Sequence, residues 1–238
     1  MVEEFRLLHN MLSSQPMCFN LFGPMVTDRK LAQQVFAGII PGGVTKVLEV
    51  KIEYAPEPVG EYLNDRTAFD AFVDFIDINN QRCFLGIETK LTEPFSPKKY
   101  DGKQYRRWSD REDSPWLKAS LPGLAEIRHN QLWRDHLLSV AMTLHPASPY
   151  KRGFCMLVYH PEDKHCHKTK EIYQELLKPE DHSFLDYPLD KLIKAIEPQL
   201  QNDHQIGWLN SFIKRYLDLS TSEEAWRETK KITDSMGN

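Results

Sequence analysis

The sequence predicts an α/β protein with core elements in the order helix, strand, strand, strand, helix, strand. Its central mixed sheet is flanked by helices, and extra helices follow at the C-terminal end. Three observations support this class: helical spacing of apolar residues in 27–40 and 123–144, three β-branched and aromatic runs between them, and a continuous apolar run at 153–159. We expect a single domain over the whole chain, with its core at about residues 27–160 and a helical elaboration at about 165–219.

The N-terminal part predicts two helices. Residues 3–12 carry apolar side chains at helical spacing, and Ser-Ser-Gln-Pro (13–16) is expected to end that helix. Residues 18–25 contain Gly-Pro near their end and predict a loop or short turn. Thr27 is the expected N-cap of the next helix, which should end at Pro41-Gly42-Gly43. The apolar stripe of this second helix consists of Leu31, Val35, Ile39 and Ile40.

Composition predicts the three strands. Residues 44–54 combine β-branched and apolar side chains, as strands do. Two further extended runs, residues 68–78 and 82–91, are joined by Asn79-Asn80-Gln81. A short Asn-rich link between two such runs indicates a β-hairpin.

The C-terminal half returns to helices after a long connection. Residues 92–122 show little periodicity and contain four prolines, so we expect a loop, and loops of that length are usually functional or disordered. Residues 123–144 predict an amphipathic helix. The run GFCMLVY (153–159) predicts a central strand covered on both faces. Three more helices are expected at about residues 168–178, 186–199 and 203–219.

The hairpin carries an unusual group of charges. Alternation places Glu88 and Lys90 on one face of their strand and Thr89 on the other. A turn centred on Asn80 would put Asp70 opposite Lys90, so the two carboxylates and the ammonium should cluster on one face. Such a cluster is costly unless it is solvated, paired or bound to a metal. Metal-assisted phosphodiester cleavage is a chemistry that uses it, because carboxylates hold Mg²⁺ and a nearby lysine offsets developing charge.

Asp70 followed by Glu88-Thr89-Lys90 at the end of the next strand resembles the PD-(D/E)XK nuclease superfamily of restriction-endonuclease-like proteins. The string FLGIETKLTEPFSP is also similar to a bacterial branch assigned to the restriction endonucleases. The resemblance implies that Asp70, Glu88 and the Thr89 carbonyl bind Mg²⁺, for which Mn²⁺ would substitute, and that Lys90 is catalytic. Phe69 stands where the signature has proline. The alternative is an exposed edge hairpin in which Asp70 and Lys90 form an ion pair worth under ~1 kcal/mol.

Gln131 and Arg134 share one face of the helix that precedes the last core strand. In several branches of the superfamily a polar residue of this helix points at the active site. The resemblance therefore implies that Gln131 supports catalysis and that Arg134 contacts a phosphate. The alternative is a polar flank on an amphipathic helix.

A basic cluster follows the hairpin. Its members are Lys98, Lys99, Lys103, Arg106 and Arg107, interleaved with Tyr100 and Tyr105 and followed by Trp108. Cations among aromatic residues suit contacts with a nucleic-acid backbone and stacking on bases. The cluster begins just beyond Lys90, so we expect it to contact DNA; the alternative is a solvated loop.

Two other groups of residues contain potential metal ligands. Glu53, Glu57 or Glu61 is a candidate additional metal ligand, and Asp74 is the rival of Asp70 if the hairpin register slides by an even number of residues. Residues 160–167 contain three histidines and a cysteine. Their spacing is too tight and irregular for a structural zinc site, which predicts a surface turn.

Composition sets further bounds. The net charge of −4 and the pI of about 6.1 exclude a bulk polyanion binder, so nucleic acid must be met by a local basic patch. Four cysteines without CxxC spacing predict reduced, buried thiols. No stretch approaches the ~20 apolar residues of a membrane span, and the acidic start does not fit a signal peptide. We therefore expect a cytoplasmic protein that has no membrane partner.

The leading hypothesis is a Mg²⁺-dependent endonuclease that hydrolyses DNA. A homodimer would match the many relatives that cut as dimers. Restriction, repair and defence all use this chemistry, so the motif leaves the role open, as it does the choice between DNA and RNA. The alternatives are a catalytically inactive nucleic-acid-binding or assembly subunit with the same fold, and an unrelated interaction protein whose hairpin carboxylates lie apart.

Overall fold

The computed structural model describes residues 13–220 and 224–227. The chain divides into two compact units, residues 1–199 and residues 200–238. The helix expected at residues 3–12 lies outside the described residues. In the described part of the chain, no helix combines the length and the apolarity that a membrane crossing requires.

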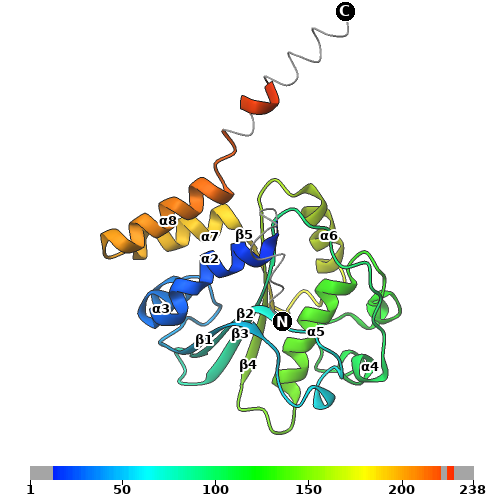
Figure 1. Ribbon diagram of the computed structural model, residues 1–238. Helices are drawn as coiled ribbons and strands as arrows, with labels where there is room; N and C mark the ends of the chain where they lie inside the picture. The colour runs from blue at the N-terminus through cyan, green and yellow to red at the C-terminus, as the bar shows by residue number, and fades with distance from the viewer. Residues whose placement is uncertain (1–12, 221–223, 228–238) are drawn as a thin grey trace, which may run out of the picture. The chain divides into compact units, whose positions relative to one another are not determined.

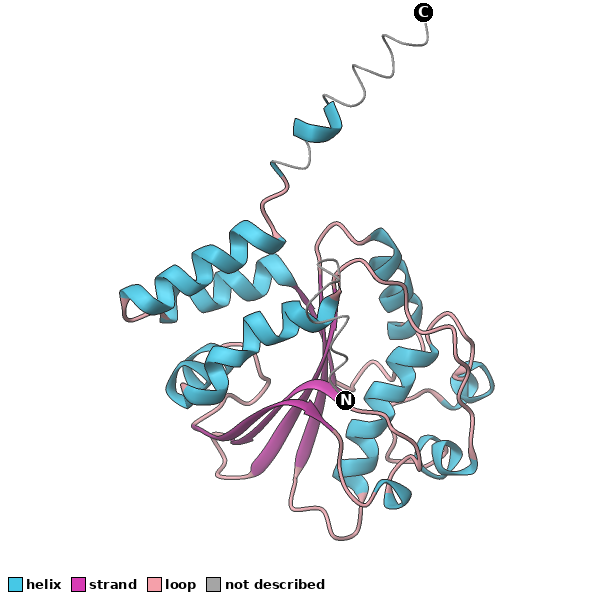
Figure 2. Ribbon diagram, in the orientation of Figure 1, coloured by secondary structure: helices cyan, strands magenta, loops and turns pink. Residues whose placement is uncertain are grey.

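A five-stranded mixed sheet forms the centre of the first unit (Figures 1 and 2). Its strands are β1 (Lys46–Tyr54), β2 (Phe69–Ile76), β3 (Arg82–Lys90), β4 (Arg152–Tyr159) and β5 (Phe184–Pro188), and they lie in that order. β1, β2 and β3 pair antiparallel, whereas β3, β4 and β5 pair parallel. This arrangement confirms the predicted α/β class, the mixed sheet and the core order.

Helices cover both faces of the sheet. On one side lie α2 (Ser14–Thr27), α3 (Arg29–Ala37) and α7 (Leu189–Ile196), and on the other α4 (Lys103–Ser109), α5 (Asn130–Leu144) and α6 (Lys164–Gln174) (Figure 1). Three short 3-10 helices occupy Val59–Glu61, Lys118–Gly123 and Glu197–Gln199. α5 packs on β4 and β3, and this contact brings it to the strands that carry the candidate catalytic residues. In the second unit, α8 (Asp203–Tyr216) is capped by Asn202, whose side chain accepts from the Gln205 N–H.

The loop predicted at residues 18–25 is wrong, because α2 spans them. Ser13, expected to help end a helix, instead caps this one: its hydroxyl accepts from the Gln15 N–H at 3.3 Å. Pro16 and Pro24 stand in the first and last turns, and a proline in the first turn costs little because its missing N–H would have no partner there. The buried residues Met17, Cys18, Leu21, Phe22 and Met25 recur at helical spacing, but the apolar Phe19 and Val26 outside this stripe make it less distinct.

The next helix begins one residue later than predicted. Thr27 is the last residue of α2, and Asp28 is the N-cap of α3, with its Oδ1 accepting from the Leu31 N–H at 2.9 Å. Leu31 and Val35 are buried, as their spacing predicted, and Ile40 is buried beyond the end of the helix.

Other elements differ from expectation where local pattern and tertiary packing compete. The predicted loop at 92–122 contains α4, in which Tyr105 and Trp108 are buried. α5 starts at Asn130 and not at 123, because the chain first runs through a 3-10 helix and turns. The strand β5 was not predicted, and the helix expected from 186 begins only after Pro188.

The turn expected at residues 160–167 is shorter than predicted. α6 begins at Lys164, capped by Asp163, and not at 168. His160 and Cys166 are buried, whereas Glu162 and His165 are exposed, so the expected surface turn is present only between the end of β4 and the start of α6. All four cysteines are free and buried, which confirms the prediction of buried thiols.

A hydrogen-bonded chain of buried side chains ties α5 to α6 and to the segment before β5. Trp116 Nε1 donates to the Tyr173 hydroxyl at 3.1 Å, and that hydroxyl lies 2.8 Å from His136 Nδ1. Ser183 Oγ donates its own proton to Asp181 Oδ1 at 2.6 Å, so it accepts from His136 Nε2–H at 2.7 Å. Nδ1 of the neutral imidazole then accepts from the Tyr173 hydroxyl. Burial lowers the pKa of His136 to about 4, so the imidazole is neutral in the folded protein.

This network predicts acid sensitivity. A histidine whose folded pKa lies below its unfolded value of 6.5 contributes stability that is present above pH 6.5 and is lost as pH falls toward 4. Between pH 6.5 and 4.5 this contribution should fall by about 2 kcal/mol. Denaturant titrations should therefore show a steeper acid loss for the wild type than for His136→Gln. Parallel pH profiles for the two proteins would contradict the assignment.

Candidate active site

A pocket of about 370 Å³ lies where β1, β2 and β3 carry their polar residues. Its walls come from the start of α2, the end of β1, the segment before β2, the end of β3, the following loop and α5. Six residues singled out in the sequence as site residues line it: Asp70, Glu88, Lys90, Lys98, Gln131 and Arg134. The structure therefore brings together groups that lie up to 64 positions apart in the chain, from Asp70 to Arg134.

Glu88, Lys90 and Gln131 form a closed triangle inside this pocket. Lys90 Nζ lies 2.9 Å from Glu88 Oε1 and donates to Gln131 Oε1 at 3.2 Å. Gln131 Nε2 in turn donates to Glu88 Oε1 at 2.5 Å. The three residues are only 6%, 7% and 9% exposed, in that order, so the ion pair is largely withdrawn from water. The Gln131 side chain, which comes from α5, thus holds both charged groups in place.

Asp70 reaches the pocket by a different route from the one its sequence position suggested. The hairpin pairs Ala71 with Ile87, so the turn is centred one residue earlier than Asn80, and Asp70 does not lie opposite Lys90. Its carboxylate turns to Thr89, and Asp70 Oδ2 accepts from the Thr89 N–H at 2.8 Å and from its hydroxyl at 2.6 Å. Asp70 therefore meets Glu88 and Lys90 at the end of the strands and not across one face.

A break in strand alternation explains this turn. Phe69 and Phe72 are three residues apart, yet both rings pack on Phe84, so the side chains change face between them. Gly86 of β3 permits this, because a Cβ there would overlap the Phe69 ring. The adjoining strand has its own irregularity at Glu53, whose φ of 55° is in the left-handed region. The break directs Asp70 away from the aromatic layer.

The site holds an unusual balance of charge. Burial, together with the nearby Glu88 carboxylate, raises the pKa of Asp70 to about 7. Burial alone would lower the pKa of Lys90, but the adjacent Glu88 overcomes this effect and raises it, so Lys90 is an ammonium. When both carboxylates are ionised, their charge exceeds that of Lys90 by one, and a divalent cation beside them would favour this ionised state.

The free oxygens of these carboxylates fit a metal ion. Asp70 uses Oδ2 for Thr89, and Glu88 uses Oε1 for Lys90 and Gln131, so Asp70 Oδ1 and Glu88 Oε2 accept no hydrogen bond from the described residues. Oxygen donors of this kind suit Mg²⁺. Thr89 does not line the pocket, and its role as a ligand through the carbonyl stays a prediction. Among the described residues, no three His, Cys, Asp or Glu side chains group closely enough to hold a metal by themselves.

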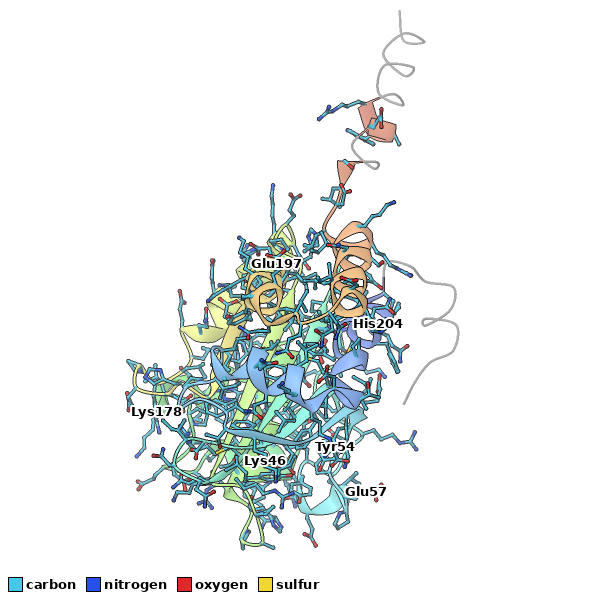
Figure 3. All side chains as sticks on the ribbon, turned by 90° about the vertical axis from the view of Figure 1, so that its left-hand side faces the viewer. Lys46, Tyr54, Glu57, Lys178, Glu197 and His204 are labelled. Atoms are coloured by element: carbon cyan, nitrogen blue, oxygen red, sulfur yellow. The ribbon has the colours of Figure 1, made fainter. Side chains whose placement is uncertain are left out.

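The other acidic candidates separate clearly. Glu53 lines the pocket and accepts from Gln15 Nε2 at 3.1 Å. Glu57 lies on the exposed loop after β1 (Figure 3), and Glu61 pairs with a histidine outside the pocket. Asp74 is buried in an ion pair with an arginine of β3, at 2.6 Å, and does not line the pocket.

The predicted basic residues are divided between two places. Lys98 and Arg134 line the pocket, whereas Lys99, Lys103, Arg106 and Arg107 do not. Arg106 is committed to Asp101 and to the Leu121 carbonyl, at 2.6 Å each. Tyr105 and Trp108 are core residues, 2% and 1% exposed, so the expectation that these aromatics would stack on bases is wrong. Tyr100, which lies under the Arg134 guanidinium at 4.8 Å, does line the pocket.

Several polar residues at the site were not predicted from the sequence. Gln15, which is 7% exposed, and the exposed Arg66 line the pocket, as do Ser14, Asp65, Thr67 and Ser96. Asp135, which is 2% exposed, lies beside Arg134 and outside the lining. Asp135 follows Gln131 by one helical turn, a spacing that could have indicated it. Burial, with Glu88 nearby, raises the pKa of Asp135 well above its usual range. Gln15 lies in a segment predicted to be irregular, so its sequence carried no signal.

Comparison with known proteins gives one finding. The family model described as the PD-(D/E)XK nuclease superfamily matches residues 1–218, which is most of the chain. A search of curated proteins gave no match.

The raised pKa of Asp70 predicts that Asp70→Asn stabilises the metal-free protein. A carboxyl group whose folded pKa of about 7 exceeds its unfolded value of 3.8 loses stability as pH rises from 3.8 to 7, so the gain should be larger at pH 8 than at pH 5. We expect the free energy of unfolding of the variant to exceed that of the wild type by at least about 1 kcal/mol at pH 8, or about 2–4 °C in Tm.

The same variant tests the metal site. Mn²⁺ should raise the Tm of the wild type but not of Asp70→Asn. Equal stabilisation of both by Mn²⁺ would remove Asp70 from the metal site.

Proposed function

The chain belongs to the PD-(D/E)XK nuclease superfamily, and from that premise we propose that it is a metal-dependent endonuclease that hydrolyses phosphodiester bonds in DNA. The observation that carries the proposal is the buried triangle of Glu88, Lys90 and Gln131 beside Asp70. Lys90 Nζ lies 2.9 Å from Glu88, and both residues line the same pocket as Asp70. A buried carboxylate and ammonium that line an open polar pocket are placed for chemistry more than for stability.

The proposed metal ligands are Asp70 and Glu88, with the Thr89 carbonyl as a third. The proposed ion is Mg²⁺, with Mn²⁺ as a substitute. When bound, Mg²⁺ polarises the phosphate and lowers the pKa of a coordinated water. Thr89 has a second role on the protein side: its N–H and hydroxyl hold Asp70 Oδ2, at 2.8 and 2.6 Å, and leave Oδ1 facing the pocket.

Lys90 is the proposed catalytic residue. An ammonium has three N–H donors, and two are directed to Glu88 and Gln131, which leaves one for the attacking water or a phosphate oxygen. In hydrolysis the water oxygen bonds to phosphorus and gives up one proton, the bond from phosphorus to the leaving oxygen breaks, and the leaving oxygen takes up one proton. The fixed positive charge of Lys90 stabilises the negative charge that grows on the phosphate. Gln131 holds Lys90 and Glu88 in register, so it acts as a positioning residue.

The substrate contacts would lie around the pocket. Lys98 and Arg134 line it and are proposed to bind phosphate, while Lys99, Lys103 and Arg107 lie farther along the same segment. Phosphate contacts of this kind position a nucleic acid without reading its sequence. They supply the local positive charge that a protein with a net charge of −4 needs in order to meet a polyanion.

A catalytically inactive subunit with the same fold is the competing proposal. A decayed site is expected to lose a carboxylate, the lysine or the residue that holds them. Here Asp70, Glu88, Lys90 and Gln131 are all present and converge on one pocket. This complete set favours a catalytic protein.

The test is Lys90→Ala in a cleavage assay on DNA with Mg²⁺. We expect the rate to fall by at least ~10², the typical effect of removing one electrostatic catalytic group. Lys46→Ala is the matched control, because Lys46 is exposed at the start of β1, whereas the pocket residue Glu53 is near the end of that strand. This variant should cleave at the wild-type rate. Circular dichroism confirms the fold of each variant. A Lys90→Ala rate equal to that of the control would remove Lys90 from the mechanism.

A further inference from the structure

Arg66 is a cation at the rim of the candidate active site. It lies four residues before Asp70, its side chain is exposed, and it lines the same pocket. Among the described residues, no carboxylate forms an ion pair with it. An arginine with no ion-pair partner among the described residues can bind an anionic ligand without first breaking a salt bridge.

The neighbours of Arg66 keep it in this state. Asp65, the adjacent carboxylate, uses Oδ1 for the Thr67 N–H and hydroxyl, at 2.8 and 2.6 Å. Its Oδ2 accepts from the hydroxyl of Tyr105, which is buried in the core. Both oxygens of Asp65 are therefore occupied. The contacts to Thr67 and Tyr105 hold the segment that carries Arg66, so a ligand would have to order the Arg66 side chain but not its backbone.

Lys98 is a second cation of the same kind on the loop after β3. It is exposed, lines the pocket and forms no ion pair within the described residues. Its loop is held to the catalytic centre: the Lys98 N–H donates to Ser96 Oγ at 3.3 Å, and the Ser96 N–H donates to Gln131 Oε1 at 2.8 Å. Arg106 differs, because Asp101 already neutralises it.

The depth of the catalytic residues determines what these two cations meet. Glu88 and Lys90 are 6% and 7% exposed, so the phosphate to be cut must enter the pocket. The phosphates adjoining it in the chain then remain at the rim. We propose that Arg66 and Lys98 bind these flanking phosphates and fix the strand in register with the catalytic centre. The proposal rests on the proposed function, since it takes a nucleic-acid strand as the substrate of this pocket.

The experiment measures the salt dependence of binding. Fluorescence anisotropy is recorded with fluorescein-labelled duplex and single-stranded DNA, at a series of salt concentrations and with Ca²⁺ in place of Mg²⁺. The proteins are the wild type, Arg66→Gln, Lys98→Gln and the charge-matched control Lys46→Gln. Lys46 is exposed at one end of β1, and Tyr54, which follows the pocket residue Glu53, is at the other (Figure 3).

Each rim variant should lose one phosphate contact. The slope of log K against log salt should therefore become shallower by about 0.9 on duplex or about 0.7 on a single strand. Lys46→Gln should keep the wild-type slope. A slope for Arg66→Gln equal to that of Lys46→Gln overturns the proposal, as does a wild type that binds neither form of DNA.

The cleavage assay separates this inference from the proposed function. A wild type that binds DNA with the expected loss of slope in the rim variants but cuts nothing contradicts the nuclease assignment and supports the phosphate contacts. A wild type that cuts DNA while Arg66→Gln keeps the control's slope contradicts the phosphate contacts and leaves the nuclease assignment standing.

Discussion

The buried ion pair between Glu88 and Lys90 is the constraint on which the site depends. Taking a carboxylate and an ammonium out of water costs several kcal/mol per ion, and their attraction repays this only when the remaining hydrogen bonds are satisfied. Gln131 supplies two of them from α5, with one amide group that donates to Glu88 at 2.5 Å and accepts from Lys90 at 3.2 Å, while Glu88 Oε2 accepts from no described residue. The packing of α5 on β3 and β4 is therefore part of the catalytic arrangement and not only of the core.

The same amide connects the site to its surroundings. Gln131 Oε1 also accepts from the Ser96 N–H at 2.8 Å, which fixes the loop that carries Lys98. On the other side of the pocket, the change of face between Phe69 and Phe72 turns Asp70 toward Thr89. The site is thus assembled at the strand ends from two supports: a helix that holds Glu88 and Lys90, and a strand irregularity that aims Asp70.

The sequence was a good guide to elements with strong periodicity and to the motif on them. The order of the core, the hairpin and the membership of Asp70, Glu88, Lys90 and Gln131 in one pocket were all predicted. The register of the hairpin was not predicted correctly. Its turn is set by hydrogen bonds to Asp77, whose Oδ1 accepts from the Asn79 and Gln81 N–H groups at 2.8 Å. The shift in register left the same residues facing the same side of the hairpin. The break in alternation after Phe69, however, turned the Asp70 side chain toward Thr89.

Tertiary packing accounts for the remaining misses. The buried stripe of α2 is bordered by the apolar residues Phe19 and Val26, and Gly23-Pro24 near its end is typical of a turn, so the sequence did not indicate a helix there. β5 has only five residues and ends in a proline, which leaves too short a pattern to read. The basic cluster was recognised by charge alone, yet its aromatic residues are core and its cations are divided, with Lys98 at the pocket and Arg106 bound to Asp101. Composition alone does not indicate whether a basic side chain forms an ion pair or whether an aromatic side chain is buried.

We propose that one divalent ion joins Asp70 and Glu88 beside Lys90, and a crystal structure of the protein soaked in Mn²⁺, with the ion located by its anomalous scattering, is the decisive test. We expect an anomalous peak at about 2.0–2.3 Å from Asp70 Oδ1 and Glu88 Oε2, the range for such a cation and oxygen ligands. A well-ordered pocket without a peak between these two oxygens, at a Mn²⁺ concentration that supports cleavage, would contradict it.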